Sequence, residues 1–146
     1  MIEGLESHLV YRAGLVPYTI NEQGKIEMLF MRPTEHEYSG YVYQIAKGRV
    51  EDEDDSFEEA AIRESREELG LLKSNVILTE EVGTFMGRTT IFVSKIKDKD
   101  LFGLPSFETE STRWMTLEEF ANEGRELHRN VVSAVYRQIK RIENID

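Results

Sequence analysis

The alternation of hydrophobic and polar positions predicts β-strands on both sides of one central helix. Residues 8–20 and 25–31 are rich in β-branched and aromatic side chains, and the turn sequence at 21–24 predicts that they pair as a hairpin. Pro17 is expected at a sheet edge or a bulge, because proline cannot donate a ladder hydrogen bond. Further strands are predicted at 41–46, at 112–115 and, as a pair around a bend at 87–88, within 76–93.

Three helices complete the predicted fold. The central one spans 56–69, with Ser56 as N-cap, Glu59 completing a capping box and Gly70 as the C-terminal stop. Residues 116–122 open a second helix with another capping pattern, and 131–142 carry the apolar stripe of an amphipathic helix. Strands, one central helix, more strands and a last helix indicate an α/β sandwich with a mixed sheet. We expect residues 1–146 to form a single domain, given the usual domain size.

Composition and charge narrow the classes of function. The formal net charge is −10, from 18 basic and 28 acidic residues, which argues against binding to a nucleic-acid polymer. The chain shows no signal-peptide pattern at its start and no apolar stretch long enough to span a bilayer. It has no cysteine, which is compatible with a reducing compartment. We therefore expect a cytoplasmic protein with no membrane partner.

The acidic residues are concentrated on the predicted central helix and before it. Glu64, Glu67 and Glu68 stand at i, i+3 and i+4, so their carboxylates lie on one side of a helix and repel one another. A hard cation such as Mg²⁺ or Mn²⁺ prefers oxygen ligands and would remove that repulsion. Arg63 can pair with one of these carboxylates and fix its rotamer. On spacing alone, a solvated charged helix explains the cluster equally well.

The segment from Gly48 to Leu71 resembles the Nudix box, the family pattern G-x5-E-x7-R-E-U-x-E-E-x-G-U, in which U is aliphatic. From Arg63 to Gly70 every fixed polar or glycine position matches. Gly48 lies one residue too far from Arg63, which implies an extra residue between Gly48 and Asp55. Asp55 itself replaces the first glutamate of the box, and Ser65 replaces an aliphatic residue.

The resemblance implies an α/β/α sandwich that hydrolyses a nucleoside diphosphate linked to another moiety. It implies divalent metal held by Glu64, Glu67 and Glu68, with the Gly48 carbonyl as a further ligand. One of these glutamates, or one on a nearby loop, would take the proton of the attacking water. Glu108 resembles the loop glutamate of some members, and Glu110 competes with it.

The resemblance also implies that the substrate is a small nucleotide. The Lys47-Gly48 sequence resembles the variant found in dinucleoside polyphosphate hydrolases, with ADP-ribose and ADP-sugar hydrolases as close competitors. Phosphate contacts are predicted for Lys47, Arg49 and Arg32. Tyr41, Tyr43 or Phe85 could stack on an adenine, although strand aromatics more often pack in the core. The histidines His8, His36 and His128 are too scattered to indicate a ligand set.

Two classes of function remain open. The first is an active metal-dependent pyrophosphohydrolase, and the second is a non-catalytic Nudix-like module that binds a nucleotide for regulation. The intact glutamate triplet favours the enzyme, because a module without catalysis need not keep three repelling acids together. A homodimer is possible, but no surface in the sequence indicates one.

Overall fold

The computed structural model describes residues 1–34 and 40–146, so the predicted loop position His36 lies outside the described residues. Its centre is a six-stranded mixed sheet in the order β4-β5-β1-β2-β6, with β3 paired to β1. The strands are β1 (Arg12–Ile20), β2 (Ile26–Pro33), β3 (Ala46–Arg49), β4 (Val76–Phe85), β5 (Thr89–Ile96) and β6 (Thr109–Met115). The helices are α1 (Phe57–Leu69), α2 (Leu117–Glu123) and α3 (Arg129–Glu143), with short 3-10 turns η1 (Lys73–Asn75) and η2 (Glu126–His128).

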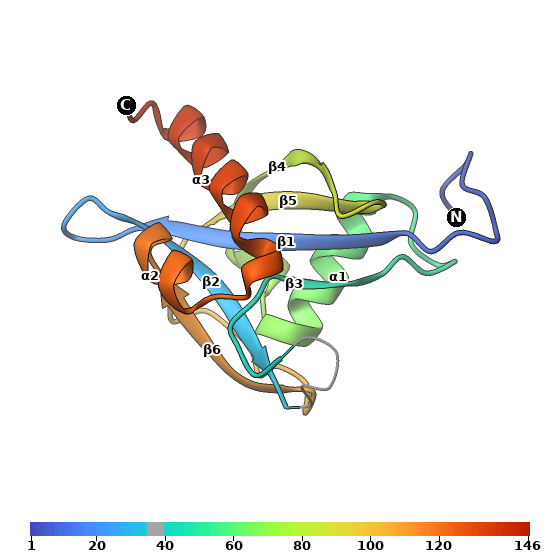
Figure 1. The fold of residues 1–146 in the computed structure, drawn as a ribbon, viewed down its shortest axis with the longest axis horizontal. Helices are drawn as coiled ribbons and strands as arrows, with labels where there is room; N and C mark the ends of the chain where they lie inside the picture. The colour runs from blue at the N-terminus through green and yellow to red at the C-terminus, as the bar shows by residue number, and fades with distance from the viewer. Residues whose placement is uncertain (35–39) are drawn as a thin grey trace.

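The sheet lies between two helical layers (Figure 1), with α1 on one face and α2 and α3 on the other. Alternate residues of β1 separate the two cores. Ala13 and Leu15 pack with Ala60 and Ala61 of α1. Val16 and Tyr18 pack on the opposite face in a cluster that includes Val132, Val135 and Ile139 of α3. The predicted α/β/α sandwich is therefore confirmed. In the described part of the chain, no helix is long and apolar enough to cross a membrane.

The third strand is displaced from its predicted position. We expected it at 41–46, but β3 begins at Ala46, and residues 43 and 44 form only isolated bridges, to Gly124 and Met31. The reason is a fork in the sheet. β2 pairs with β1 only at 18–20 and then diverges toward β6, and β3 fills the space beside the first half of β1. Local sequence does not encode such a fork.

The prediction for Pro17 was also wrong. Pro17 lies inside β1, paired in parallel with Ser94 of β5, and not at an edge strand. On its other side β1 pairs with β3 up to Leu15 and with β2 from Tyr18 onward. Pro17 falls in the gap between these two pairings, so the missing N–H is tolerated within a central strand.

The ends of α1 follow the sequence with one difference. The Ser56 hydroxyl accepts a hydrogen bond from the Glu59 N–H at 3.0 Å, as expected of an N-cap. The Glu59 carboxylate accepts from the Asp55 N–H at 3.2 Å and does not close the box on Ser56 itself. Gly70 ends the helix in the left-handed conformation at φ 75°, which glycine adopts without steric cost.

Candidate active site

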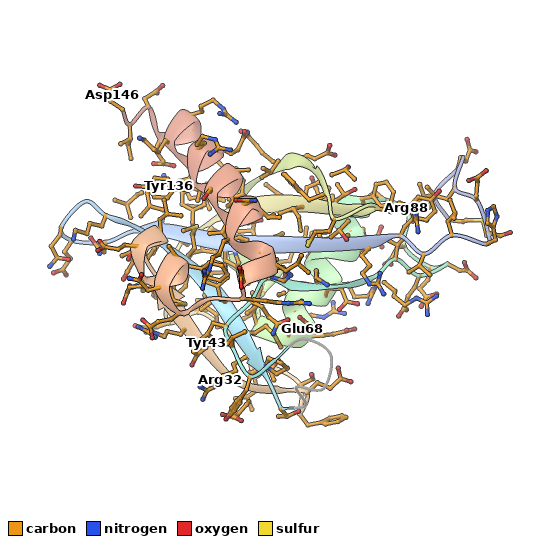
Figure 2. All side chains as sticks on the ribbon, in the orientation of Figure 1. Arg32, Tyr43, Glu68, Arg88, Tyr136 and Asp146 are labelled. Atoms are coloured by element: carbon orange, nitrogen blue, oxygen red, sulfur yellow. The ribbon has the colours of Figure 1, made fainter. Side chains whose placement is uncertain are left out.

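The second half of α1 places two acidic side chains against β3. Glu64 is buried, and a Cβ atom added to Gly48 would lie 2.3 Å from its carboxylate carbon. Only glycine at position 48 leaves room for the carboxylate so close to the strand backbone. One turn later, Glu68 accepts a hydrogen bond from the Lys47 N–H at 3.2 Å. Figure 2 shows Glu68 at the end of α1 beside β3. The helix thus presents Glu64 and Glu68 to consecutive residues of one strand.

The segment 103–109, which precedes β6, fixes this end of the helix. Its donors bond to carbonyl groups at the end of α1: the Ser106 N–H to Glu67 and the Gly103 N–H to Gly70, both at 2.7 Å, and the Thr109 hydroxyl to Glu68 at 2.8 Å. The last carbonyls of a helix have no partners within the helix, so these bonds replace water. The loop that carries Glu108 is therefore attached to the turn that carries Glu68.

A pocket of about 140 Å³ lies between these elements. Glu68, Glu108, Lys47 and Gln44 supply its polar lining, and Met31, Pro33 and Ile45 supply the apolar part. Glu110, the competing candidate, points elsewhere, since its carboxylate pairs with Arg32 at 2.8 Å and with the Tyr41 hydroxyl. The geometry therefore favours Glu108 over Glu110 as the loop carboxylate of the site.

Arg63 holds the acids and the preceding loop together. Its guanidinium donates to both carboxylate oxygens of Asp54, at 3.1 and 2.9 Å, to Glu64 at 2.9 Å and to the Arg49 carbonyl at 3.0 Å. The Asp54 side chain is only 3% exposed. Such a two-pronged pair fixes both partners in one geometry. Arg63 therefore holds the Glu64 carboxylate beside the Asp54 side chain.

This pairing corrects the alignment to the Nudix box. We expected Asp55 to replace the box glutamate, but its side chain is 78% exposed and contacts the N-terminal amine of Met1. Asp54, which faces Arg63, lies six residues after Gly48, as the box requires. The extra residue therefore lies between Asp54 and Arg63, and not between Gly48 and Asp55.

Ser65 faces the interior below the site. It is fully buried, and its hydroxyl has no hydrogen-bond partner. The Nudix box has an aliphatic side chain at this position, and a buried hydroxyl without a partner in its place is destabilising.

Electrostatics at the site favour a bound cation. Burial raises the pKa of Glu68 to about 8, with the nearby Glu64 charge adding to the effect. Burial also raises the pKa of Glu64, although Arg63 opposes the change. Both acids lie in the second half of α1, where the negative end of the helix dipole disfavours anions. Two carboxylates in this state gain from any nearby positive charge.

The donor set fits a hard divalent ion, because it consists of the carboxylates of Glu64 and Glu68 and the Gly48 backbone beside them. Glu67 lies on the exposed side of this set: its side chain is 47% exposed, and its carboxylate is 3.6 Å from the Arg63 nitrogen that also binds Glu64. Within residues 1–34 and 40–146, no three acidic or histidine side chains surround one point. The structure thus sets Glu64 and Glu68 against β3, and Glu67 lies beside Glu64 through their shared partner Arg63.

The remaining predicted substrate residues divide into two groups. Lys47 lines the pocket, and Arg49 is exposed on β3. Arg32 belongs to a separate cluster, with its guanidinium 4.3 Å from the Tyr41 ring centre and 5.2 Å from that of Tyr43. Figure 2 shows Arg32, near the end of β2, and Tyr43 on the same side of the molecule as Glu68. Phe85 packs against the core on the α3 face.

Sequence reasoning missed three residues near the site. Gln44 lines the pocket, and from the connection between α2 and α3 Arg125 bonds to Gln44 while His128 bonds to Ile45. His128 is fully buried and accepts a hydrogen bond from the Ile45 N–H at 3.1 Å. No local pattern indicates Arg125 and His128, because they lie 81 and 83 positions away from the residues 44 and 45 that they contact.

The mixed sheet between helical layers, with a carboxylate-bearing helix set against a glycine of the sheet, defines the class of protein. The NUDIX domain family model matches residues 10–135, and the chain belongs to the Nudix family. Comparison with curated proteins gives no match.

Solved structures share the fold. An Ap4A hydrolase from C. elegans, solved as a binary complex, has a TM-score of 0.69 at 23% identity and covers 90% of this chain and 98% of its own. The Nudix hydrolase RenU from M. smegmatis has a TM-score of 0.67 at 17% identity, over 92% and 85%. The NUDIX domain of Shewanella oneidensis NrtR, solved with ADP ribose, has a TM-score of 0.71 at 11% identity, over 93% and 94%.

Proposed function

We propose that this protein hydrolyses a pyrophosphate bond in a nucleoside diphosphate linked to another moiety, such as a dinucleoside polyphosphate or ADP-ribose, with Mg²⁺ or Mn²⁺ as cofactor. The observation that carries the proposal is the pair of carboxylates, the buried Glu64 and the half-buried Glu68, set against Lys47-Gly48 of β3. Membership of the Nudix family and the shared fold with an Ap4A hydrolase support the reaction class.

Each site residue has a proposed role. Glu64, Glu68 and the Gly48 carbonyl would hold the metal, with Glu67 as a further ligand from the exposed side of the helix. When bound, the ion supplies charge stabilisation for the pyrophosphate and makes a coordinated water more acidic. Arg63 keeps Glu64 in place through its own pairing with Asp54. Lys47, Arg49 and Arg32 are the proposed phosphate contacts.

Glu108 is the proposed general base. It is exposed to solvent and lines the same pocket as Glu68, so it can reach a water molecule placed there. Its proximity also adds negative charge to the site, which contributes to the raised pKa of Glu68. Glu67 is the second candidate, because it is exposed on the same side of α1.

A substrate panel tests the proposal directly. Diadenosine tetraphosphate, ADP-ribose, ADP-sugars and nucleoside triphosphates would be incubated with the protein and Mg²⁺, and products identified in oxygen-18 water. We expect turnover of at least one substrate, and a loss of more than 100-fold in Glu64→Gln and Glu68→Gln, with folding checked by circular dichroism. Exposed Glu58 provides the matched control, and Glu58→Gln should keep full activity. Full turnover in Glu68→Gln would remove that residue from the mechanism.

The alternative is a nucleotide-binding module without catalysis. The shared fold with the NrtR NUDIX domain, which was solved with ADP ribose, favours this second candidate. The same panel separates the two, because a module would bind a nucleotide in calorimetry without forming product. Four expectations from the sequence stay predictions. They are that the protein binds no nucleic-acid polymer, that it is cytoplasmic, that a homodimer is possible, and that residues 1–146 form a single domain.

A further inference from the structure

Three cationic side chains share one face of the β1–β3 ribbon. In the antiparallel register Arg12 lies opposite Arg49, and Gly14 lies opposite Lys47. Cross-strand partners share a face, and so do residues two apart on one strand. Arg12, Lys47 and Arg49 therefore lie together on the face of the sheet that α3 covers farther along, since the alternate residue Ala13 packs toward α1.

Arg125 reaches the same region from the segment between α2 and η2. Its backbone N–H donates to the Tyr43 carbonyl at 2.9 Å, and its guanidinium donates to the side-chain oxygen of Gln44 at 3.3 Å. Burial and the positive charges of Arg125 and Arg12 lower the pKa of Lys47. Arg125 and Arg12 each lie close enough to Lys47 to repel its ammonium group.

The neighbouring histidine cannot offset this charge. Nδ1 of His128 accepts a hydrogen bond from the Ile45 N–H, so its ring hydrogen sits on Nε2, 3.2 Å from the Arg125 guanidinium. That nitrogen then offers Arg125 no lone pair. Burial, together with the charges of Arg125 and Lys47, lowers the pKa of His128 to about 3. The imidazole is therefore neutral and adds no compensating negative charge beside the Arg125 guanidinium.

We call the four cations Arg12, Lys47, Arg49 and Arg125 the cationic face. Among the described residues, no acidic side chain lies within ion-pair distance of any of them. Yet the chain has 28 acidic residues against 18 basic ones. Like charges across a strand pair are destabilising, and a half-buried charge without a partner is more so. An anionic ligand would relieve both costs.

We infer that the cationic face binds the phosphates of a linear polyphosphate chain that extends from the acidic pair past Lys47 to Arg125. Lys47 links the two regions, since its N–H donates to Glu68 and its ammonium lies close enough to Glu64 and Glu68 to be attracted by both carboxylates. Gln44 links them as well, because it lines the pocket beside Glu68 and accepts from Arg125. This inference rests on the proposed function for the position of the cleaved bond.

The cationic face also selects among the proposed substrates. ADP-ribose carries only two phosphates, and both lie at the bond to be cleaved, where the metal would neutralise them. A dinucleoside tetraphosphate carries further anionic phosphates outside that bond, and these require cations of the protein. The structure therefore favours a nucleotide with a polyphosphate chain longer than two phosphates over ADP-ribose and ADP-sugars.

The first test measures binding of inorganic tripolyphosphate by calorimetry in EDTA, where hydrolysis plays no part. Wild-type protein should bind it, and Arg125→Gln should weaken binding about tenfold or more, because a charged hydrogen-bonded contact is lost. Arg125→Lys should give an intermediate value, since the charge remains without the planar fork. Exposed Arg137 on α3 is the matched control, and Arg137→Gln should change affinity less than twofold. Circular dichroism checks folding of each variant.

The second test measures kcat/KM for diadenosine tetraphosphate and for ADP-ribose with Mg²⁺. In Arg125→Gln the ratio of these two values should fall about tenfold, through KM for the tetraphosphate. An unchanged ratio overturns the selection for chain length. Absence of tripolyphosphate binding, or equal binding by Arg125→Gln and Arg137→Gln, overturns the cationic face even if the protein hydrolyses nucleotides. Arg125-dependent binding without any turnover supports the face and removes the proposed hydrolase.

Discussion

Neutralising Glu68 should stabilise the metal-free protein at alkaline pH. Burial and the neighbouring Glu64 raise the pKa of Glu68 from 4.5 to about 8 in the folded chain. A carboxyl group whose pKa is raised on folding contributes stability at low pH, fully present below about 4.5, and loses it as the pH rises toward 8. Glu68→Gln removes that loss, because glutamine keeps the shape of the side chain and does not ionise.

The size of the effect follows from the difference between the two pKa values. The rise from 4.5 to about 8 is 8 − 4.5 = 3.5. At about 1.4 kcal/mol for each pH unit, this gives an upper bound of roughly 5 kcal/mol. Glu68 retains some contact with solvent, so we expect a gain of about 2–3 kcal/mol for the variant at pH 8.5.

Urea denaturation in EDTA, followed by circular dichroism at pH 5 and pH 8.5, measures this gain. The free energies of unfolding of wild type and Glu68→Gln should be similar at pH 5 and diverge at pH 8.5. Adding Mg²⁺ at pH 8.5 should raise the wild-type value and close most of the gap. Glu58→Gln, at an exposed site on the same helix, should follow the wild type at both pH values. If Glu68→Gln were no more stable than the wild type at pH 8.5, the burial of this charge would not be costly and the reasoning would be refuted.

Three further pairs of substitutions, each a test variant with its control, probe the packing around the site. Asp54→Asn should lower the free energy of unfolding by about 3 kcal/mol in urea denaturation, because it breaks a buried ion pair with Arg63. The control Asp55→Asn should change it by less than about 0.5 kcal/mol, and the reverse order would restore the original alignment of the box. Ser65→Ala should raise the free energy of unfolding by about 1 kcal/mol, because it removes an unpaired buried hydroxyl, while Ser56→Ala at the N-cap should lower it by about 1 kcal/mol. A loss of stability in Ser65→Ala would indicate that the hydroxyl is hydrogen-bonded. Gly48→Ala should reduce hydrolysis more than 100-fold, because the new Cβ would lie 2.3 Å from the Glu64 carboxylate carbon. Gly103→Ala, whose new Cβ would make only ordinary contacts, should remain active. An active Gly48→Ala enzyme would exclude the close approach of Glu64 to the β3 backbone.

The sequence alone determined the features that depend on neighbours in the chain. The spacing of Glu64 and Glu68 places both on one side of α1, because a helix turns once in 3.6 residues. Ser56 and Gly70 mark the ends of that helix for equally local reasons, a hydroxyl that caps an N–H and a glycine that adopts positive φ. The family resemblance rested on these residues, and the match over 10–135 confirmed it.

The tertiary structure decided which residues meet across long separations. The conformation of the loop before α1 turns Asp54, rather than Asp55, toward Arg63. Composition does not distinguish two adjacent aspartates. Pro17 is tolerated inside β1 because it lies between the residues that pair with β3 and those that pair with β2. Arg125 and His128 join the site through contacts with residues 44 and 45 that are 81 and 83 positions away. Local periodicity reports only on the next few residues, whereas these contacts depend on how whole layers pack.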